Sequence, residues 1–172
     1  MEMCCIMIVE DKPEEQENAL EAVKRALNLN GEPFGVNLPL AEFIGTRYFI
    51  YGEVGGETGV MIWIASHLAA FKGRLGFLDS KMFPKRLILT DLMFPADKRG
   101  KENMNGIEVI IDAIEGGIPV VVCSDTDHHD VPFMPRLIGM LEKQHPMGHI
   151  PVVLDKKDWE RAVARGLTLL NE

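Results

Sequence analysis

Short apolar runs alternate with amphipathic segments along most of the chain. The runs are continuous over residues 3–9 (MCCIMIV), 86–90 (RLILT) and 118–124 (IPVVVCS). Strands that are covered on both faces have this pattern, because neither side of the strand meets water. The aromatic and β-branched run at 47–51 and the apolar run at 149–154 predict two further strands.

Helical periodicity is clearest over residues 14–27, EEQENALEAVKRAL. The apolar residues recur at helical spacing, the acids come early, and Lys24 and Arg25 come late, as the helix dipole favours. Further helices are predicted at 60–74, 105–117, 133–145 and 158–170. Strands and helices therefore alternate, which predicts an α/β fold with a doubly wound, five-stranded parallel sheet and helices on both faces.

Composition narrows the classes of function. The 172 residues suit a single domain. The net charge of −8 argues against binding to nucleic acid or to an anionic membrane, and it is compatible with binding a cation. We expect a cytoplasmic protein, since no apolar stretch reaches the length of a membrane span and no signal segment leads the chain. Cys4, Cys5 and Cys123 lie in apolar runs without metal-ligand spacing, so we expect reduced, buried thiols.

Polar residues that can do chemistry follow the predicted strands. In a doubly wound sheet the carboxyl ends of the parallel strands share one edge, where binding sites form. The residues expected at that edge are Glu10, Asp11, Asp91, Ser124, Lys156 and Lys157. Clustered carboxylates repel one another, and a hard cation such as Mg²⁺ relieves the repulsion. A lysine and a serine hydroxyl can then bind phosphoryl oxygens, and an aspartate oxygen can act as a nucleophile.

Three of these strand ends resemble the receiver domain of two-component response regulators. IMIVEDKPEEQENAL resembles the first strand of the family with its acid pair, here Glu10 and Asp11. LILTDLMFP is similar to the third strand, with the phosphoacceptor aspartate at Asp91 and the proline of the family at Pro95. IPVVVCS resembles the fourth strand, which ends in a hydroxyl residue, here Ser124.

Two further segments extend the resemblance over most of the chain. NMNGIEVI (103–110) is similar to the segment that directly follows the proline in the family, and YGEVGGETGVMIWI (51–64) resembles the second strand, its loop and the next helix. The resemblance implies one flavodoxin-like, receiver-like domain over residues 1–172. The insertions into that domain are expected near 28–46, 73–84 and 96–102.

The resemblance also implies a function. Asp91 would accept a phosphoryl group from a histidine kinase or a phosphotransfer protein in a Mg²⁺-dependent relay. Glu10 and Asp11 would hold the Mg²⁺ together with Asp91, while Ser124 and a lysine would bind the phosphoryl group. The chain has DKKDW in place of the Lys-Pro of the family, and we favour Lys156 over the lysine that follows it.

Two departures from the family pattern keep other functions open. Asp125 stands after Ser124 where the family has a small residue, and residues 96–102 interrupt the loop beside Asp91, where we expect them to cover the acidic edge as a flap. These departures motivate an alternative, a degenerate receiver-like module that binds a protein and is not phosphorylated. A phosphohydrolase with Asp91 as nucleophile is a third hypothesis, disfavoured because Met93 stands where haloacid-dehalogenase phosphatases have a second aspartate.

Three other signals have simpler interpretations. SDTDHHD (124–130) is interpreted as a solvated loop rather than a transition-metal site. GEVGGETG (52–59) lacks the Lys-Ser/Thr ending of a phosphate loop, so a flexible turn is expected. His67 lies in an apolar segment and is interpreted as a hydrogen-bonded core histidine.

Overall fold

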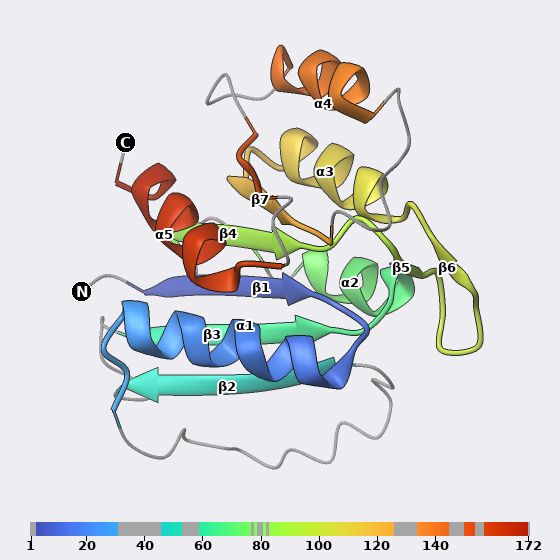
Figure 1. The fold of residues 1–172 in the computed structure, drawn as a ribbon. Helices are drawn as coiled ribbons and strands as arrows, with labels where there is room; N and C mark the ends of the chain where they lie inside the picture. Colours follow the sequence, from blue (N-terminus) through green and yellow to red (C-terminus); the bar gives the residue numbers. More distant parts are fainter. Residues whose placement is uncertain are drawn as a thin grey trace.

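Strands and helices alternate along the chain (Figure 1). The computed structural model describes residues 3–30, 46–52, 59–76, 78, 81, 83–125, 134–144, 150–153 and 157–171. The elements are, in chain order, β1 (Cys4–Val9), α1 (Pro13–Ala26), β2 (Thr46–Gly52), β3 (Gly59–Ala65), α2 (Leu68–Leu75), β4 (Lys85–Thr90), β5 (Phe94–Pro95), β6 (Glu102–Asn103), α3 (Gly106–Glu115), β7 (Val120–Cys123), α4 (Met134–Glu142), β8 (Val152–Val153) and α5 (Trp159–Leu169).

A six-stranded sheet forms the centre of the fold, in the order β2-β3-β1-β4-β7-β8. The strands β3, β1, β4, β7 and β8 are parallel, and β2 pairs antiparallel with β3 at one edge. The parallel strands have the order of a doubly wound, flavodoxin-like sheet, in which the first strand lies between the second and the third. The predicted α/β fold is therefore confirmed, with one antiparallel edge strand added to it.

The prediction of one helix over residues 60–74 is wrong in its first half. Gly59–Ala65 is the strand β3, and the helix α2 begins only at Leu68. A short apolar run fits a buried strand and a buried helix equally well, so periodicity could not separate the two. Pairing with β1 on one side and β2 on the other satisfies the backbone of this run as a strand.

The strand predicted at 47–51 is present in β2, but it is not the second strand of the parallel sheet. It runs antiparallel along β3, and β3 takes the position beside β1. The resemblance of residues 51–64 had placed the second parallel strand before the loop and a helix after it. In the structure, the segment after the loop is itself that strand, β3. The loop between β2 and β3, residues 53–58, lies outside the described residues.

Helices cover both faces of the sheet (Figure 1). Alternate residues of β1 point to opposite faces, as the period of a strand requires. On one face, Ile6 and Ile8 pack in a cluster with α1 and α5; on the other, Met7 and Val9 pack in a cluster with α2 and α3. Cys4, Cys5 and Cys123 are buried and free, as predicted. Within the described part of the chain, no helix is long and apolar enough to cross a membrane.

The expected insertions differ in how much of them is described. Most of 28–46 and parts of 73–84 lie outside the described residues, as do 126–133. Residues 96–101 connect the short antiparallel strands β5 and β6, so the expected insertion at 96–102 ends inside β6, and we call residues 94–103 the ribbon. The backbone N–H of Ala69 in α2 donates to the carbonyl of Ala96 at 2.9 Å, which attaches the base of the ribbon to α2.

Helix α5 approaches the sheet closely at Gly166. A Cβ atom at this position would lie 2.6 Å from Cδ2 of Leu87 in β4, and Leu87 is fully buried. The side chain of Leu87 would have to shift to admit a Cβ at Gly166, and because protein interiors are close-packed, this shift has a cost. The absence of a side chain at Gly166 thus sets the distance between α5 and the sheet.

We predict that Gly166→Ala destabilises the fold by about 1–3 kcal/mol, the range for overpacked cores. The matched control is Gly73→Ala in α2, where an added Cβ meets nothing within 4 Å. That change is expected to stabilise by up to about 1 kcal/mol, since alanine favours helix more than glycine does. Urea unfolding measures both. Equal effects of the two substitutions would contradict the close contact with Leu87.

Candidate functional site

The carboxyl ends of the parallel strands carry the candidate residues. Backbone hydrogen bonds continue the sheet just beyond the strands. Glu10 N donates to Ala65 O at 3.0 Å, Asp91 N donates to Val9 O at 2.9 Å, and Ser124 N donates to Val153 O at 2.9 Å. The positions of Glu10, Asp91 and Ser124 are thus fixed by the sheet itself.

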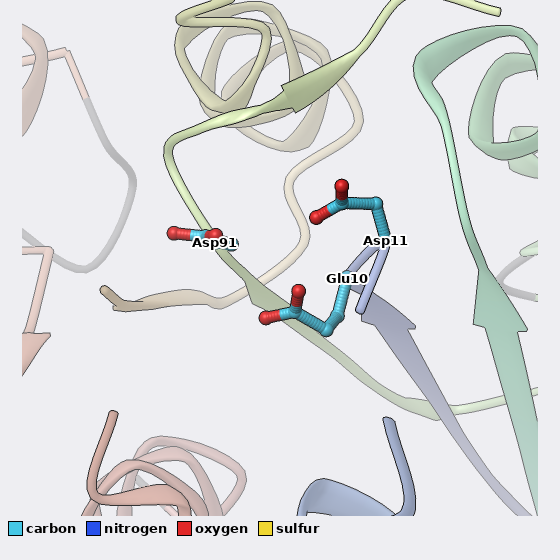
Figure 2. A group of neighbouring side chains, drawn as sticks. All are labelled: Glu10, Asp11 and Asp91. Atoms are coloured by element: carbon cyan, nitrogen blue, oxygen red, sulfur yellow. The ribbon is translucent and has the colours of Figure 1, made fainter. Parts of the chain in front are cut away.

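Three carboxylates converge at this edge (Figure 2). Glu10 and Asp11 follow β1, and Asp91 follows the neighbouring strand β4. One oxygen from each of the three lies within 4.8 Å of the others. Glu10 and Asp91 are fully buried, and Asp11 is half-buried. The structure therefore brings together the three acids that the sequence singled out.

Lys157 is the lysine described at this site. Its Nζ donates to Oε2 of Glu10 at 2.6 Å and to Oδ2 of Asp91 at 2.8 Å, and all three side chains are buried. Lys157 has a φ of 51°, an uncommon conformation for a residue with a side chain. Lys156, which the sequence favoured, lies outside the described residues.

Both carboxylate oxygens of Asp91 have partners. Oδ1 accepts hydrogen bonds from the Oγ of Ser124 at 2.5 Å and from the backbone N of Leu92 at 2.6 Å. Oδ2 faces Lys157. Residues from three separate strand ends therefore hold this one carboxylate, and Ser124 and Lys157 are both within reach of anything attached to it.

Comparison with known proteins tests the fold alone. No family model matches the chain, and no curated protein matches it. Among solved structures, the RcsB response regulator of Salmonella typhimurium superposes with a TM-score of 0.55 and 14% identity, covering 99% of this chain and 61% of that chain. A response regulator from Colwellia psychrerythraea matches with a TM-score of 0.48 and 18% identity, over 98% of this chain and 97% of that chain. The chain has a receiver-like fold. It spans 61% of the length of RcsB.

Residues that the sequence analysis missed hold Glu10 in place through hydrogen bonds. Gln16 Nε2 in α1 donates to the carbonyl of Glu10 at 2.6 Å, and Lys12 N donates to Oε1 of Glu10 at 3.0 Å. These contacts orient Glu10 toward Asp91. The lone polar Gln16 on the buried side of α1 is the signal that could have found them, because a buried amide needs a partner.

Gly106 fixes the loop that follows Asp91. A Cβ at Gly106 would lie 2.3 Å from the backbone oxygen of Asp91 and 2.6 Å from Cα of Leu92. Only glycine permits this approach, and Gly106 N donates to Leu92 O at 3.0 Å. The first turn of α3 therefore packs directly on the backbone of Asp91. The segment NMNGIEVI was noted for its resemblance, but its glycine was not assigned this role.

The ribbon leaves the sheet at the same end as the acids (Figure 1). Its anchor is Phe94, which is fully buried and whose carbonyl accepts a hydrogen bond from Asn105 Nδ2 at 2.6 Å. Lys98, Arg99 and Lys101 are exposed. That these residues cover the acids as a flap stays a prediction.

The site is short of positive charge. Three carboxylates against one ammonium leave a formal charge of −2. Burial raises the pKa of Glu10 from its ordinary value of 4.5 to about 8; the charge of Asp91 adds to this, and Lys157 opposes it. Burial alone would lower the pKa of Lys157, but the charges of Glu10 and Asp91 outweigh burial and raise it. Both shifts mean that the site favours bound protons.

A divalent cation fits this donor set. Carboxylate oxygens are the ligands that hard cations prefer, and such a cation would supply the missing positive charge. The buried Oδ1 of Asp11 accepts no hydrogen bond from the described residues, so protein donors do not fully engage this third carboxylate and it can contribute an oxygen to a cation. Glu10, Asp11 and Asp91 together are therefore suited to hold Mg²⁺.

We predict that Lys157→Met destabilises the protein by about 3–5 kcal/mol at neutral pH in EDTA, because the buried carboxylate of Asp91 would then lose its ammonium partner. Lys156→Met is the matched control. It removes the same charge one residue earlier and is expected to have a small effect. Urea unfolding measures both variants. If Lys156→Met proved the more damaging of the two, Lys157 would not be the lysine of this site.

We predict that stability in EDTA falls as pH rises from about 5 to about 8. With a pKa raised from 4.5 to about 8, Glu10 holds a proton in the folded state that it has lost in the unfolded state across this range. Linkage then lowers the free energy of unfolding with rising pH, with a slope of at most about 1.4 kcal/mol per pH unit for one proton.

Glu10→Gln should remove this pH dependence, and Glu14→Gln, an exposed acid of α1, should leave it in place. The measurement is urea unfolding at several pH values. A wild-type stability that rises between pH 5 and pH 8 would contradict the assignment.

Proposed function

We propose that the chain is a receiver that accepts a phosphoryl group on Asp91 in a reaction that depends on Mg²⁺. The observation that carries the proposal is the convergence of three carboxylates within 4.8 Å, with Lys157 and Ser124 on the two oxygens of Asp91. A carboxylate nucleophile, an adjacent hard-cation site and two donors for a phosphoryl group are the parts that phosphoryl transfer to aspartate needs. The phosphodonor would be a histidine kinase or a phosphotransfer protein.

The chemical step is a displacement at phosphorus. A carboxylate oxygen of Asp91 forms a bond to phosphorus, the bond from phosphorus to the leaving group breaks, and the leaving group takes the electron pair. Mg²⁺ held by Glu10, Asp11 and Asp91 would offset charge on the phosphoryl oxygens.

The donors that now contact Asp91 would then serve the product. The hydroxyl of Ser124 can rotate about its side-chain bond and donate to a phosphoryl oxygen instead of Oδ1. Lys157 would keep one contact to Glu10 and give its other to the phosphoryl group. Asp91 is fully buried, so its carboxylate must become accessible before a phosphodonor can react with it.

A specific observation favours the second candidate, a receiver-like module that binds a protein without being phosphorylated. Both oxygens of Asp91 are already engaged, and the side chain is buried. Asp125 adds a half-buried carboxylate beside Ser124. In this interpretation Lys157 permanently occupies Oδ2 of Asp91 and the edge is structural.

Labelling with acetyl phosphate and Mg²⁺ separates the two candidates. We expect wild-type protein to gain one phosphoryl group by intact mass, and we expect none in EDTA or in Asp91→Asn. Asp97→Asn, in the exposed part of the ribbon, is the matched control and should be labelled normally. A wild type that takes up no phosphoryl group from acetyl phosphate, while binding Mg²⁺ normally, would favour the binding module.

The same experiment tests Asp125. A carboxylate about 4 Å from a phosphoryl dianion costs on the order of 1–4 kcal/mol, depending on solvent access. Asp125→Ala is therefore expected to retain the label longer than wild type after the donor is removed. An unchanged lifetime would mean that Asp125 does not face the phosphoryl group.

A further inference from the structure

His67 sits at a junction beside the acidic edge and has a role there that the fold alone does not explain. It follows β3 and precedes α2, and its side chain is 6% exposed. Its Nδ1 accepts a hydrogen bond from the backbone N of Ala70 at 3.0 Å, so it caps the helix. Because Nδ1 is an acceptor, the proton of the neutral ring is on Nε2.

The second ring nitrogen of His67, Nε2, takes no part in the helix cap. His67 Nε2 is buried and has no hydrogen-bond partner among the residues that the structure describes. Serine or threonine would cap the helix without burying a second polar side-chain atom. A buried donor without an acceptor is costly, so it needs a partner that the protein side chains do not provide.

Asp11 has a buried acceptor that could pair with the donor of His67. Its Oδ1 is a buried acceptor that likewise has no hydrogen-bond partner in the described residues. A carboxylate oxygen and an N–H are a donor and acceptor pair, and each lies two residues beyond the end of its strand. The strands are neighbours, and Val9 of β1 is in register with Ala65 of β3.

The alternation of the two strands places both side chains on the same side. Met7 and Val9 of β1 and Trp63 and Ala65 of β3 all belong to the core cluster on the face of α2 and α3. The backbone pairing continues past the strands, since Glu10 N donates to Ala65 O. Continuing the alternation sends Asp11 and His67 toward that same face.

We propose that a bound water molecule bridges His67 Nε2 and Asp11 Oδ1, and that His67 is thereby a positioning residue of the acidic site. A buried water with two or more polar partners is a common way to satisfy such atoms. The water accepts the N–H of His67 and donates to Asp11, which leaves the other oxygen of Asp11 directed at the cation. A hydrogen bond of this kind to a metal-binding side chain orients that side chain and changes its affinity for the metal. This consequence for the cation rests on the proposed function; the bridge itself does not.

The first test is made without any cation. In EDTA, the Nε2 signal of His67 in ¹⁵N NMR spectra is assigned from its loss in His67→Asn, a variant that keeps a helix cap. We expect Asp11→Ala to shift this signal and Glu14→Ala, an exposed acid of the same charge, to leave it unchanged. A signal that does not respond to Asp11→Ala would overturn the bridge.

The second test measures Mg²⁺ affinity by calorimetry. His67→Ser keeps a helix cap and is expected to stay folded in EDTA but to bind Mg²⁺ about tenfold more weakly, as expected for loss of a group that orients a ligand. Unchanged affinity would overturn the positioning role. If wild type itself binds no Mg²⁺, the proposed function fails, and the shift of the His67 signal by Asp11→Ala in EDTA still decides the bridge.

Discussion

The ammonium group of Lys157 joins the two ends of the chain at one point. It contacts Glu10, which follows the first strand, and Asp91 in the middle of the chain, and Glu10 and Lys157 are 147 residues apart in sequence. Moving three charges out of water is expensive, and only close, well-directed hydrogen bonds recover the cost. The acidic edge can therefore form only once β1, β4 and the segment that leads into α5 are all in place. Contacts of such long sequence separation are slow to form, because a large loop must close first.

The same interaction defines what else the site can hold. One ammonium cannot neutralise three carboxylates, so the edge needs either protons or a further cation. Glu10 is supported by Gln16 and Lys12 and cannot turn away, and Asp91 is supported by Leu92 and Ser124. Since these hydrogen bonds hold Glu10 and Asp91 in place, a change in the charge of the site must be balanced by a proton or an ion that binds there. A receiver-like fold with this edge is thus chemically prepared for an ion, whichever of the two functions it serves.

Much of the fold could be predicted from the sequence, because the parallel strands are buried and their ends carry the polar residues. The acids Glu10, Asp11 and Asp91 were found for this reason: Glu10 and Asp91 directly follow an apolar run, and Asp11 follows Glu10. The run at 60–65 was misread as helix, since a fully buried segment has no polar side to reveal its period. The sequence has no pattern that separates two adjacent lysines; the structure describes Lys157 at the site, and Lys156 lies outside the described residues.

Contacts that a backbone atom or a glycine makes could not be predicted from the sequence for a different reason. The approach of Gly106 to the carbonyl of Asp91 depends on how α3 is placed, and one glycine among many gives no sign of it. The hydrogen bond from Gln16 to the backbone of Glu10 differs in this respect, because a polar residue on the buried side of α1 is a signal in the sequence. The water bridge inferred for His67 has a sequence signal only in retrospect, as a histidine where a simpler cap would serve.

The ribbon has a consequence for how this protein can be modified. Its two strands, β5 and β6, pair with each other, with Phe94 opposite Asn103 and Pro95 opposite Glu102. The two ends of the ribbon therefore lie side by side. Because the two ends meet at a fixed separation, the number of residues between them has no effect on the backbone of Asp91 or on the start of α3. The cost of lengthening such a loop grows only slowly with its length. The tip, residues 97–101, is accordingly a natural point at which to insert a fluorescent or affinity tag beside the acidic edge without altering its geometry.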